Sequence, residues 1–360
     1  AAVETAGAPV EQETVVQSDG SLLDMQLRAI IAEQGLTGDP STGREIPTID
    51  EPIAQLGKRL FFTQALGGDM DSACASCHLP TLGGGDDLPL SIGVGADDPH
   101  LLGPGRTHYE GEFTVPRNAP TTFNIALWDK FIFHDGRIES LGKTDGLNGA
   151  DGLGIRTPDV PLGQLDPLAG VNLTWAQSRF PMTSPEEMRG FDFAAHETNQ
   201  DCRDHLAARL GNYGNGEGEL AFNNWLAEFE SVYGPSEDIK ELVTEQRIAE
   251  AISEYERSQT FVNTPWKAFV EGDASAISEA AKRGALLFYT STEQGGADCA
   301  SCHSGDFFTD EDFHVQAVPQ IGRGKGDGLT RTDDFGRFRE TRQLKDLYAF
   351  RTPSLINVTV

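Results

Sequence analysis

The chain has 360 residues, enough for two or three domains, and 38% of them are hydrophobic, which is sufficient for a packed core. Asp and Glu number 56 against 28 Lys and Arg, so the formal charge is −28. A surface this acidic repels phosphate backbones and attracts basic proteins, which argues against nucleic-acid binding. No run approaches the roughly 20 consecutive apolar residues of a membrane helix, so no integral membrane segment is predicted.

The cysteines and the start of the chain indicate the compartment. Five cysteines, of which four form two CxxC pairs and Cys202 is left over, do not make a disulfide-dense scaffold. We expect Cys202 to be a buried or idle thiol and not a metal ligand. The sequence starts at Ala1 with neither Met nor the apolar stretch of a signal peptide. We therefore expect a mature exported, periplasmic protein whose signal peptide has been removed.

In chain order, the acidic and aperiodic residues 1–20 are predicted to form a flexible arm. Helical periodicity over 21–35 predicts a first helix, with Ser21 as its N-cap and Gly35 as its C-cap. A second helix is predicted over 53–62.

The remaining chain alternates loops and helices. Residues 79–120 and most of 138–185 are rich in Gly, Pro and Asp, which predicts loops. Helical patterns follow over 218–262, interrupted near a Gly-Pro pair, and over 275–289. No strand longer than a few residues is expected, so the fold class is mainly α with long irregular loops.

An internal repeat organises the chain. Residues 56–78 and 283–303 share a helical pattern and both end in CASCH, and RNAPTTFN at 117–124 is echoed by RTPSLIN at 351–357. The FHDGR segment of the first copy has its counterpart just past Val360, so we expect the second copy to be cut short and a C-terminal segment to be missing.

The repeat predicts four parts. After the arm we expect an N-terminal domain at 21–217, connecting helices at 218–275 and a C-terminal domain at 276–360.

The strongest chemical signal is the CASCH sequence, which occurs twice. Two thiols three positions apart can form thioethers with both vinyl groups of one haem, and the adjacent His then lies under the iron. A four-Cys zinc site would not need a His after each pair, and a pair of redox disulfides lacks the βαβ pattern on which such sites lie. Two covalently attached c-type haems are therefore predicted, at the residues Cys74, Cys77, His78, Cys299, Cys302 and His303.

The order of GKRLFF, CASCH, DDLPLSIGVG, RNAPTTFN, HDGR, a second CASCH and FRTPSLIN resembles the bacterial di-haem cytochrome c peroxidase/MauG family over roughly residues 50–360. The resemblance implies two cytochrome c-like helical domains, each with one haem, and a calcium ion between the haems. It implies that the N-terminal haem reacts with hydrogen peroxide, and that the C-terminal haem passes electrons or shares the oxidising equivalents.

The same resemblance assigns roles to single residues. His78 matches the proximal ligand of the peroxide-reacting haem and His303 that of the electron-transfer haem. Gln177 and Glu187 match the distal pair that helps to split the O–O bond, since a carboxylate over the iron can move a proton from one oxygen to the other. Glu187 could instead be an ordinary residue near a helix N-terminus. Asn118 matches a calcium ligand.

Departures from the family pattern carry information. Val94 stands where a histidine caps the first haem in peroxidases that rest inactive, so we expect an open iron site unless His100 or His108 substitutes. His134 replaces the Trp that relays electrons between the haems, and Trp128 is another candidate for that relay.

The sixth ligand of the second haem is not identified from the sequence. All four Met residues precede the second CASCH. His314 and Tyr348 are candidates within the chain, but we expect both to be structural and the ligand to lie beyond Val360.

The valine and the FHDGR variant favour the MauG/MbnH-like branch of the family. This branch predicts an enzyme that uses hydrogen peroxide to form high-valent iron at the first haem and oxidises an external donor, here a protein. Two alternatives stay open: a peroxidase supplied with electrons by a small cytochrome c or cupredoxin, and a non-catalytic di-haem electron-transfer cytochrome.

Overall fold

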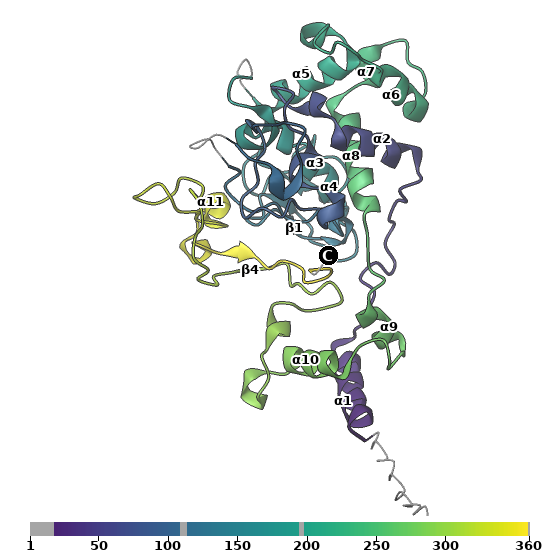
Figure 1. Cartoon of the computed structure of the whole chain (residues 1–360), viewed down its shortest axis with the longest axis vertical. Helices are drawn as coiled ribbons and strands as arrows, with labels where there is room; N and C mark the ends of the chain where they lie inside the picture. The colour runs from purple at the N-terminus through teal and green to yellow at the C-terminus, as the bar shows by residue number, and fades with distance from the viewer. Residues whose placement is uncertain (1–17, 109–113, 194–197, 359–360) are drawn as a thin grey trace, which may run out of the picture. The chain divides into compact units, whose positions relative to one another are not determined.

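The computed structural model describes residues 18–108, 114–193 and 198–358, and Figure 1 shows helices and short strands connected by long loops. Most of the predicted arm lies outside the described residues. Within the described part of the chain, no helix is both long enough and apolar enough to cross a membrane.

The chain divides into two compact units. The smaller one combines the described part of Ala1–Gly38 with Asn263–Ser301, and the larger one combines Asp39–Val262 with the described part of Cys302–Val360. The domain boundaries expected from the repeat remain predictions.

In the smaller unit, the first predicted helix forms as α1 (Ser18–Gln34). Ser21 lies inside this helix instead of capping it. The helix ends before Gly35 as predicted, and the φ of +65° at this glycine suits a residue without a Cβ.

Two further helices belong to this unit. α10 (Glu279–Tyr289) lies within the predicted helical stretch before the second CASCH, and its Lys282 pairs with Asp24 of α1 at 2.7 Å. α9 (Pro265–Glu271) is capped by the side chain of Thr264. The buried core of the unit consists of Leu27, Ile31, Leu36 and Phe269.

The regular elements of the larger unit are mainly helices, connected by long irregular loops. α2 (Pro52–Phe62), at the second predicted position, packs across α8 (Glu245–Ser258) (Figure 1). At their crossing a Cβ on Gly57 would overlap the carbonyl of Ala251, so the close approach requires glycine. The other helices are α3 (Cys74–Cys77), α4 (Leu173–Ser178), α5 (Asn199–Gly211), α6 (Trp225–Tyr233), α7 (Ile239–Leu242) and α11 (Phe338–Thr341).

Among these helices, α5 was not expected from the sequence. Its buried face includes arginines, which hide the apolar periodicity of the segment NQDCRDHLAARLG. The guanidinium of buried Arg209 donates hydrogen bonds to the carbonyls of Ala65 and Gly67 and so holds the loop that leads into the first CASCH. Cys202, also on α5, is buried as predicted.

The strands are short, as the sequence predicts. β1 (Phe131–Ile132), β2 (Ile138–Ser140) and β3 (Ile155–Arg156) form an antiparallel sheet in that order. β4 (Phe313–His314) pairs with β5 (Phe350–Arg351), also antiparallel. Irregular loops between these strands and the helices carry most of the residues that surround the cavity described next.

Candidate functional site

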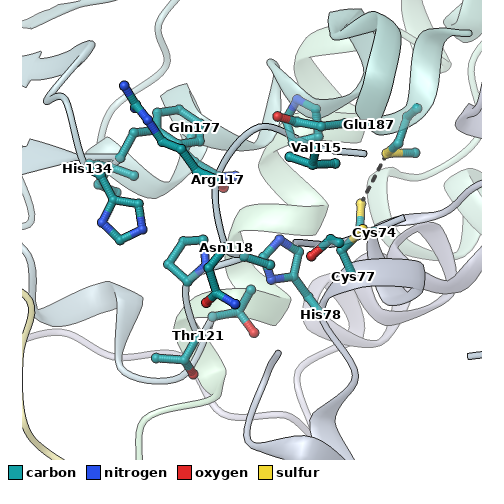
Figure 2. A pocket seen from close by; sticks show the side chains of 18 of the residues that line it. Cys74, Cys77, His78, Val115, Arg117, Asn118, Thr121, His134, Gln177 and Glu187 are labelled. Carbon is teal, nitrogen blue, oxygen red and sulfur yellow. Dashed lines mark hydrogen bonds between the residues drawn. The ribbon is translucent and has the colours of Figure 1, made fainter. Parts of the chain in front are cut away.

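The larger unit contains a cavity with about 850 Å³ of space that protein atoms do not fill. Part of this space is open to solvent. Figure 2 shows the cavity from close by. Seven residues singled out from the sequence line it: Cys74, Cys77, His78, Asn118, His134, Gln177 and Glu187.

The first CASCH forms one end and one wall of the cavity. α3 is a single helical turn, which places Cys74 and Cys77 next to each other at the cavity with His78 directly after them. The Nδ1 atom of His78 lies 3.1 Å from the carbonyl of Gly84, to which it can only donate, so Nε2 keeps its lone pair. Burial lowers the pKa of His78, which favours the neutral form that a metal ligand needs.

The two thiols of this turn are not activated. Burial raises the pKa of Cys77 to about 12, and burial also raises the pKa of Cys74. A redox-active or nucleophilic cysteine has a lowered pKa instead. The environment therefore disfavours a redox disulfide and suits thiols that are consumed in thioether bonds.

Gln177 and Glu187 lie across the cavity from His78 (Figure 2). Gln177 comes from α4 and is buried, and its Oε1 has no hydrogen-bond partner within the described structure. Burial raises the pKa of Glu187, although the positive charges of Arg137 and Lys325 act in the opposite direction. A carboxylate with a raised pKa is a better proton acceptor than an ordinary carboxylate and can return the proton that it accepts.

A π-helical turn, Pro185–Arg189, sets the position of Glu187. Such turns are rare and are frequent at functional sites. Gly93 of the SIGVG loop passes so close that an added Cβ would overlap the carbonyl of Glu187. Arg106 fixes this loop by donating to the carbonyls of Ile92 at 2.8 Å and Gly93 at 2.6 Å.

The three residues considered as a cap for the first haem all lie away from the cavity lining. Val94 is buried, and its backbone N–H donates to the carbonyl of Glu186 at 3.3 Å. His100 is exposed and His108 is half-buried, and neither belongs to the lining residues. The described structure thus brings no histidine of this loop to the space between His78 and the distal pair.

A third wall of the cavity is cationic. Arg117, Arg137 and Lys325 line it together with His134. Burial and the neighbouring guanidinium groups, that of Arg351 first, lower the pKa of His134 to about 4, so its imidazole is neutral at pH 7.

Trp128, the other relay candidate, is not a lining residue. Its indole is buried and packs edge-on against Phe307, with ring centroids 4.9 Å apart. The guanidinium of Arg351 lies 3.3 Å from the centre of the indole. A cation at that position opposes removal of an electron from the ring. Of the two relay candidates, His134 is the one that lines the cavity.

Asn118 lines the cavity, and its Nδ2 donates to the carbonyl of Leu88 at 2.8 Å. This hydrogen bond orients the amide and leaves Oδ1, the atom that would bind calcium, for another partner.

The second CASCH repeats one detail of the first. The Nδ1 of His303 lies 3.1 Å from the carbonyl of Phe308, just as His78 is oriented by a carbonyl that follows it. His314 pairs with Asp310 at 2.8 Å, and their ligand atoms lie within 4.8 Å of the Cys302 thiol. Tyr348 donates its hydroxyl hydrogen to Asp333 at a partly exposed position.

Comparison with known proteins identifies the family. Residues 51–275 match the family model described as "Di-haem cytochrome c peroxidase". The chain belongs to the di-haem cytochrome c peroxidase family. It is 28% identical to the methylamine utilization protein MauG of Methylorubrum extorquens over 86% of this chain and 62% of the relative. A cytochrome-c peroxidase of Denitromonas iodatirespirans is 26% identical over 84% of this chain and 66% of the relative.

The chain thus spans slightly less than two thirds of the length of these two relatives. Among solved structures, a MauG-like protein associated with microbial copper homeostasis aligns with a TM-score of 0.55 at 19% identity, over 87% of this chain and 73% of the other. This likeness shows that the chain has the fold of the di-haem peroxidases.

The residues around the cavity fit a haem. Both thiols lie at one end, His78 lines the space with its Nδ1 oriented by the carbonyl of Gly84, the unsatisfied Gln177 oxygen lies across it, and cationic side chains line the far end. Lys325 is a lining residue that sequence reasoning missed. It lies in a Gly-rich loop almost 250 residues after the first CASCH, and no local pattern connects the two.

Proposed function

We propose that this protein is a periplasmic di-haem enzyme that reduces hydrogen peroxide at the His78 site and takes the electrons from an external protein. The proposal rests on one observation above all: Glu187 and Gln177 lie across the cavity from His78, and no described histidine of the SIGVG loop reaches the space between them. One haem would be attached at Cys74 and Cys77, and the other at the second CASCH.

When bound, the haem supplies the redox-active iron at which peroxide is reduced. Glu187 accepts the proton from the peroxide oxygen nearer His78 and returns it to the farther oxygen, which leaves as water. In total, one hydrogen peroxide with two electrons and two protons would give two waters. Gln177 holds the peroxide through its amide, and the walls around the cavity restrict access of bulk water.

The proposed electron source is a protein residue, as in the MauG/MbnH-like branch. Val94 in place of a capping histidine and His134 in place of the relay tryptophan support this choice. A peroxidase supplied by a small cytochrome c or cupredoxin is the second candidate, because the charge of −28 suits a basic donor. We further propose calcium at Asn118 and one cytochrome c-like domain around each haem.

The decisive test is the rate at which peroxide reacts with the oxidised protein, followed by stopped-flow absorbance. We expect Glu187→Gln to slow this reaction by about 100-fold or more, since general acid–base groups contribute about 10²–10⁴. Gln177→Leu should weaken peroxide binding and slow the reaction less.

Glu241→Gln, at an exposed position of α7, is the matched control and should react like the wild type. Equal rates for the wild type and Glu187→Gln would overturn the proposal and leave the non-catalytic electron-transfer cytochrome.

A further inference from the structure

The charges at the far end of the cavity do not balance. Figure 2 shows Arg117 and His134 on the side away from Cys74 and Cys77. Arg117 pairs with Asp135 at 2.7 Å and with Asp334 at 2.6 Å.

The next cation shares one of these carboxylates. Arg137 also pairs with Asp135, at 3.2 Å, and its guanidinium stacks on Phe133. The two carboxylates are therefore fully used by the two arginines, and Lys325 is a third cation at the same wall.

Lys325 has no counter-ion of its own. Within the described structure, neither an ion pair nor a hydrogen bond engages its Nζ, although the residue is only partly exposed. Burial and the charges of Arg137 and Arg117 lower its pKa to about 8, and the attraction of Asp135 and Glu187 does not offset them. A lysine in such surroundings lacks an anion.

The loop 322–328 fixes Lys325 at this wall. Arg323 pairs with Glu186 at 2.5 Å, so the loop is attached to the π-helical turn that carries Glu187. The backbone N–H of Lys325 donates to the carbonyl of Asp333 at 3.0 Å, and a Cβ on Gly324 would overlap the carbonyl of Thr332. The lysine is thus held by a closely packed loop.

The chemical structure of haem indicates which anion would pair with Lys325. A haem carries two vinyl groups on one edge and two carboxylates, the propionates, on the opposite edge. If Cys74 and Cys77 hold the vinyl edge, the propionates point to the cationic end of the cavity. We propose that Lys325 binds a propionate of the haem at the His78 site, and that the Arg323–Glu186 pair positions it.

This inference rests on the haem attachment of the proposed function but not on peroxide turnover. Removing a positive charge beside the haem stabilises the more positive ferric state, so the reduction potential must fall. We expect Lys325→Met to lower the midpoint potential of the haem at the His78 site and to shift its propionate bending mode in the resonance Raman spectrum. Lys325→Arg, which keeps the charge, should restore both towards the wild type.

Arg323→Gln should change the potential in the same direction but less, since it frees the loop without removing the lysine. Lys240→Met, at an exposed position of α7, makes the same change in net charge and should leave both readouts unchanged. An unchanged potential and Raman mode in Lys325→Met would overturn the proposal, as would equal shifts in Lys325→Met and Lys325→Arg. A wild-type chain without haem at Cys74 and Cys77 would instead overturn the proposed function.

Discussion

Glu256 on α8 has a buried carboxyl group. Within the described structure, its Oε2 atom accepts no hydrogen bond. Burial alone raises its pKa from 4.5 to about 8, and its charge acts on the thiol of Cys74. Between these two pH values the native protein keeps a proton that the unfolded chain has released. The free energy of unfolding therefore falls as the pH rises through this window, by up to about 1.4 kcal/mol per pH unit.

The variant Glu256→Gln keeps the shape of the side chain and cannot ionise. We expect the free energy of unfolding of this variant to exceed that of the wild type by roughly 1–3 kcal/mol at pH 8. At pH 5 the two free energies of unfolding should be nearly equal. Denaturant unfolding at the two pH values measures the difference, with exposed Glu241→Gln as the control. A wild type and variant with the same pH dependence would show that Glu256 is ionised in the native state.

At the scale of single residues, local spacing predicted much of the lining of the site. Cys74, Cys77 and His78 are neighbours in sequence, and Gln177 and Glu187 lie ten positions apart, so a resemblance could select them and the structure places them around one cavity. Their roles remain proposals. Lys325 could not be selected in this way, because only the path of the chain in space brings it to this cavity.

Among the elements, the π-helical turn Pro185–Arg189 has the tightest packing at the site. Gly93 touches its backbone from the SIGVG loop, and backbone atoms cannot move aside as a flexible side chain can. Gly93→Ala should therefore cost about 1–3 kcal/mol of stability. It should also displace Glu187 and slow the reaction with peroxide.

Thermal unfolding and stopped-flow absorbance together measure both effects. Gly105→Ala is the matched control, since a Cβ there makes only ordinary contacts with the side chain of Leu101. If Gly93→Ala keeps the wild-type stability and rate, the loop does not position the turn.

Helices with an apolar stripe were predictable, and those without one were not. The apolar spacing of α2 indicates its position to within one residue. α5 was not predicted from the sequence because Arg203 and Arg209 are buried among its core positions, where they bind backbone carbonyls. The π-helical turn has no sequence signature at all, since it depends on the loop packed against it.

For the whole molecule, the excess of acidic residues affects the choice of partner. A reduced basic cytochrome c is attracted by a charge of −28, and the attraction weakens as the Debye length falls from about 30 Å at 10 mM salt to about 8 Å at 150 mM. If the electron source is a protein residue, we expect steady-state turnover with this cytochrome below about 1 s⁻¹, the low end for enzymes, even at 10 mM salt.

Absorbance of the cytochrome during peroxide addition measures this turnover, and an acidic cytochrome c is the control for charge steering. Fast turnover that falls steeply with salt would contradict the protein-oxidising function and support the peroxidase supplied by a soluble donor.

The loop 322–328 completes a wall of a cavity whose other walls come from residues 73–188. A chain that crosses a membrane from its N-terminus delivers Cys74 and Cys77 long before Lys325 emerges. During that interval the first haem pocket lacks one wall, which leaves room for the machinery that joins porphyrin to thiol. Closure of the wall by this later part of the chain would then follow haem attachment and separate assembly from catalysis in time.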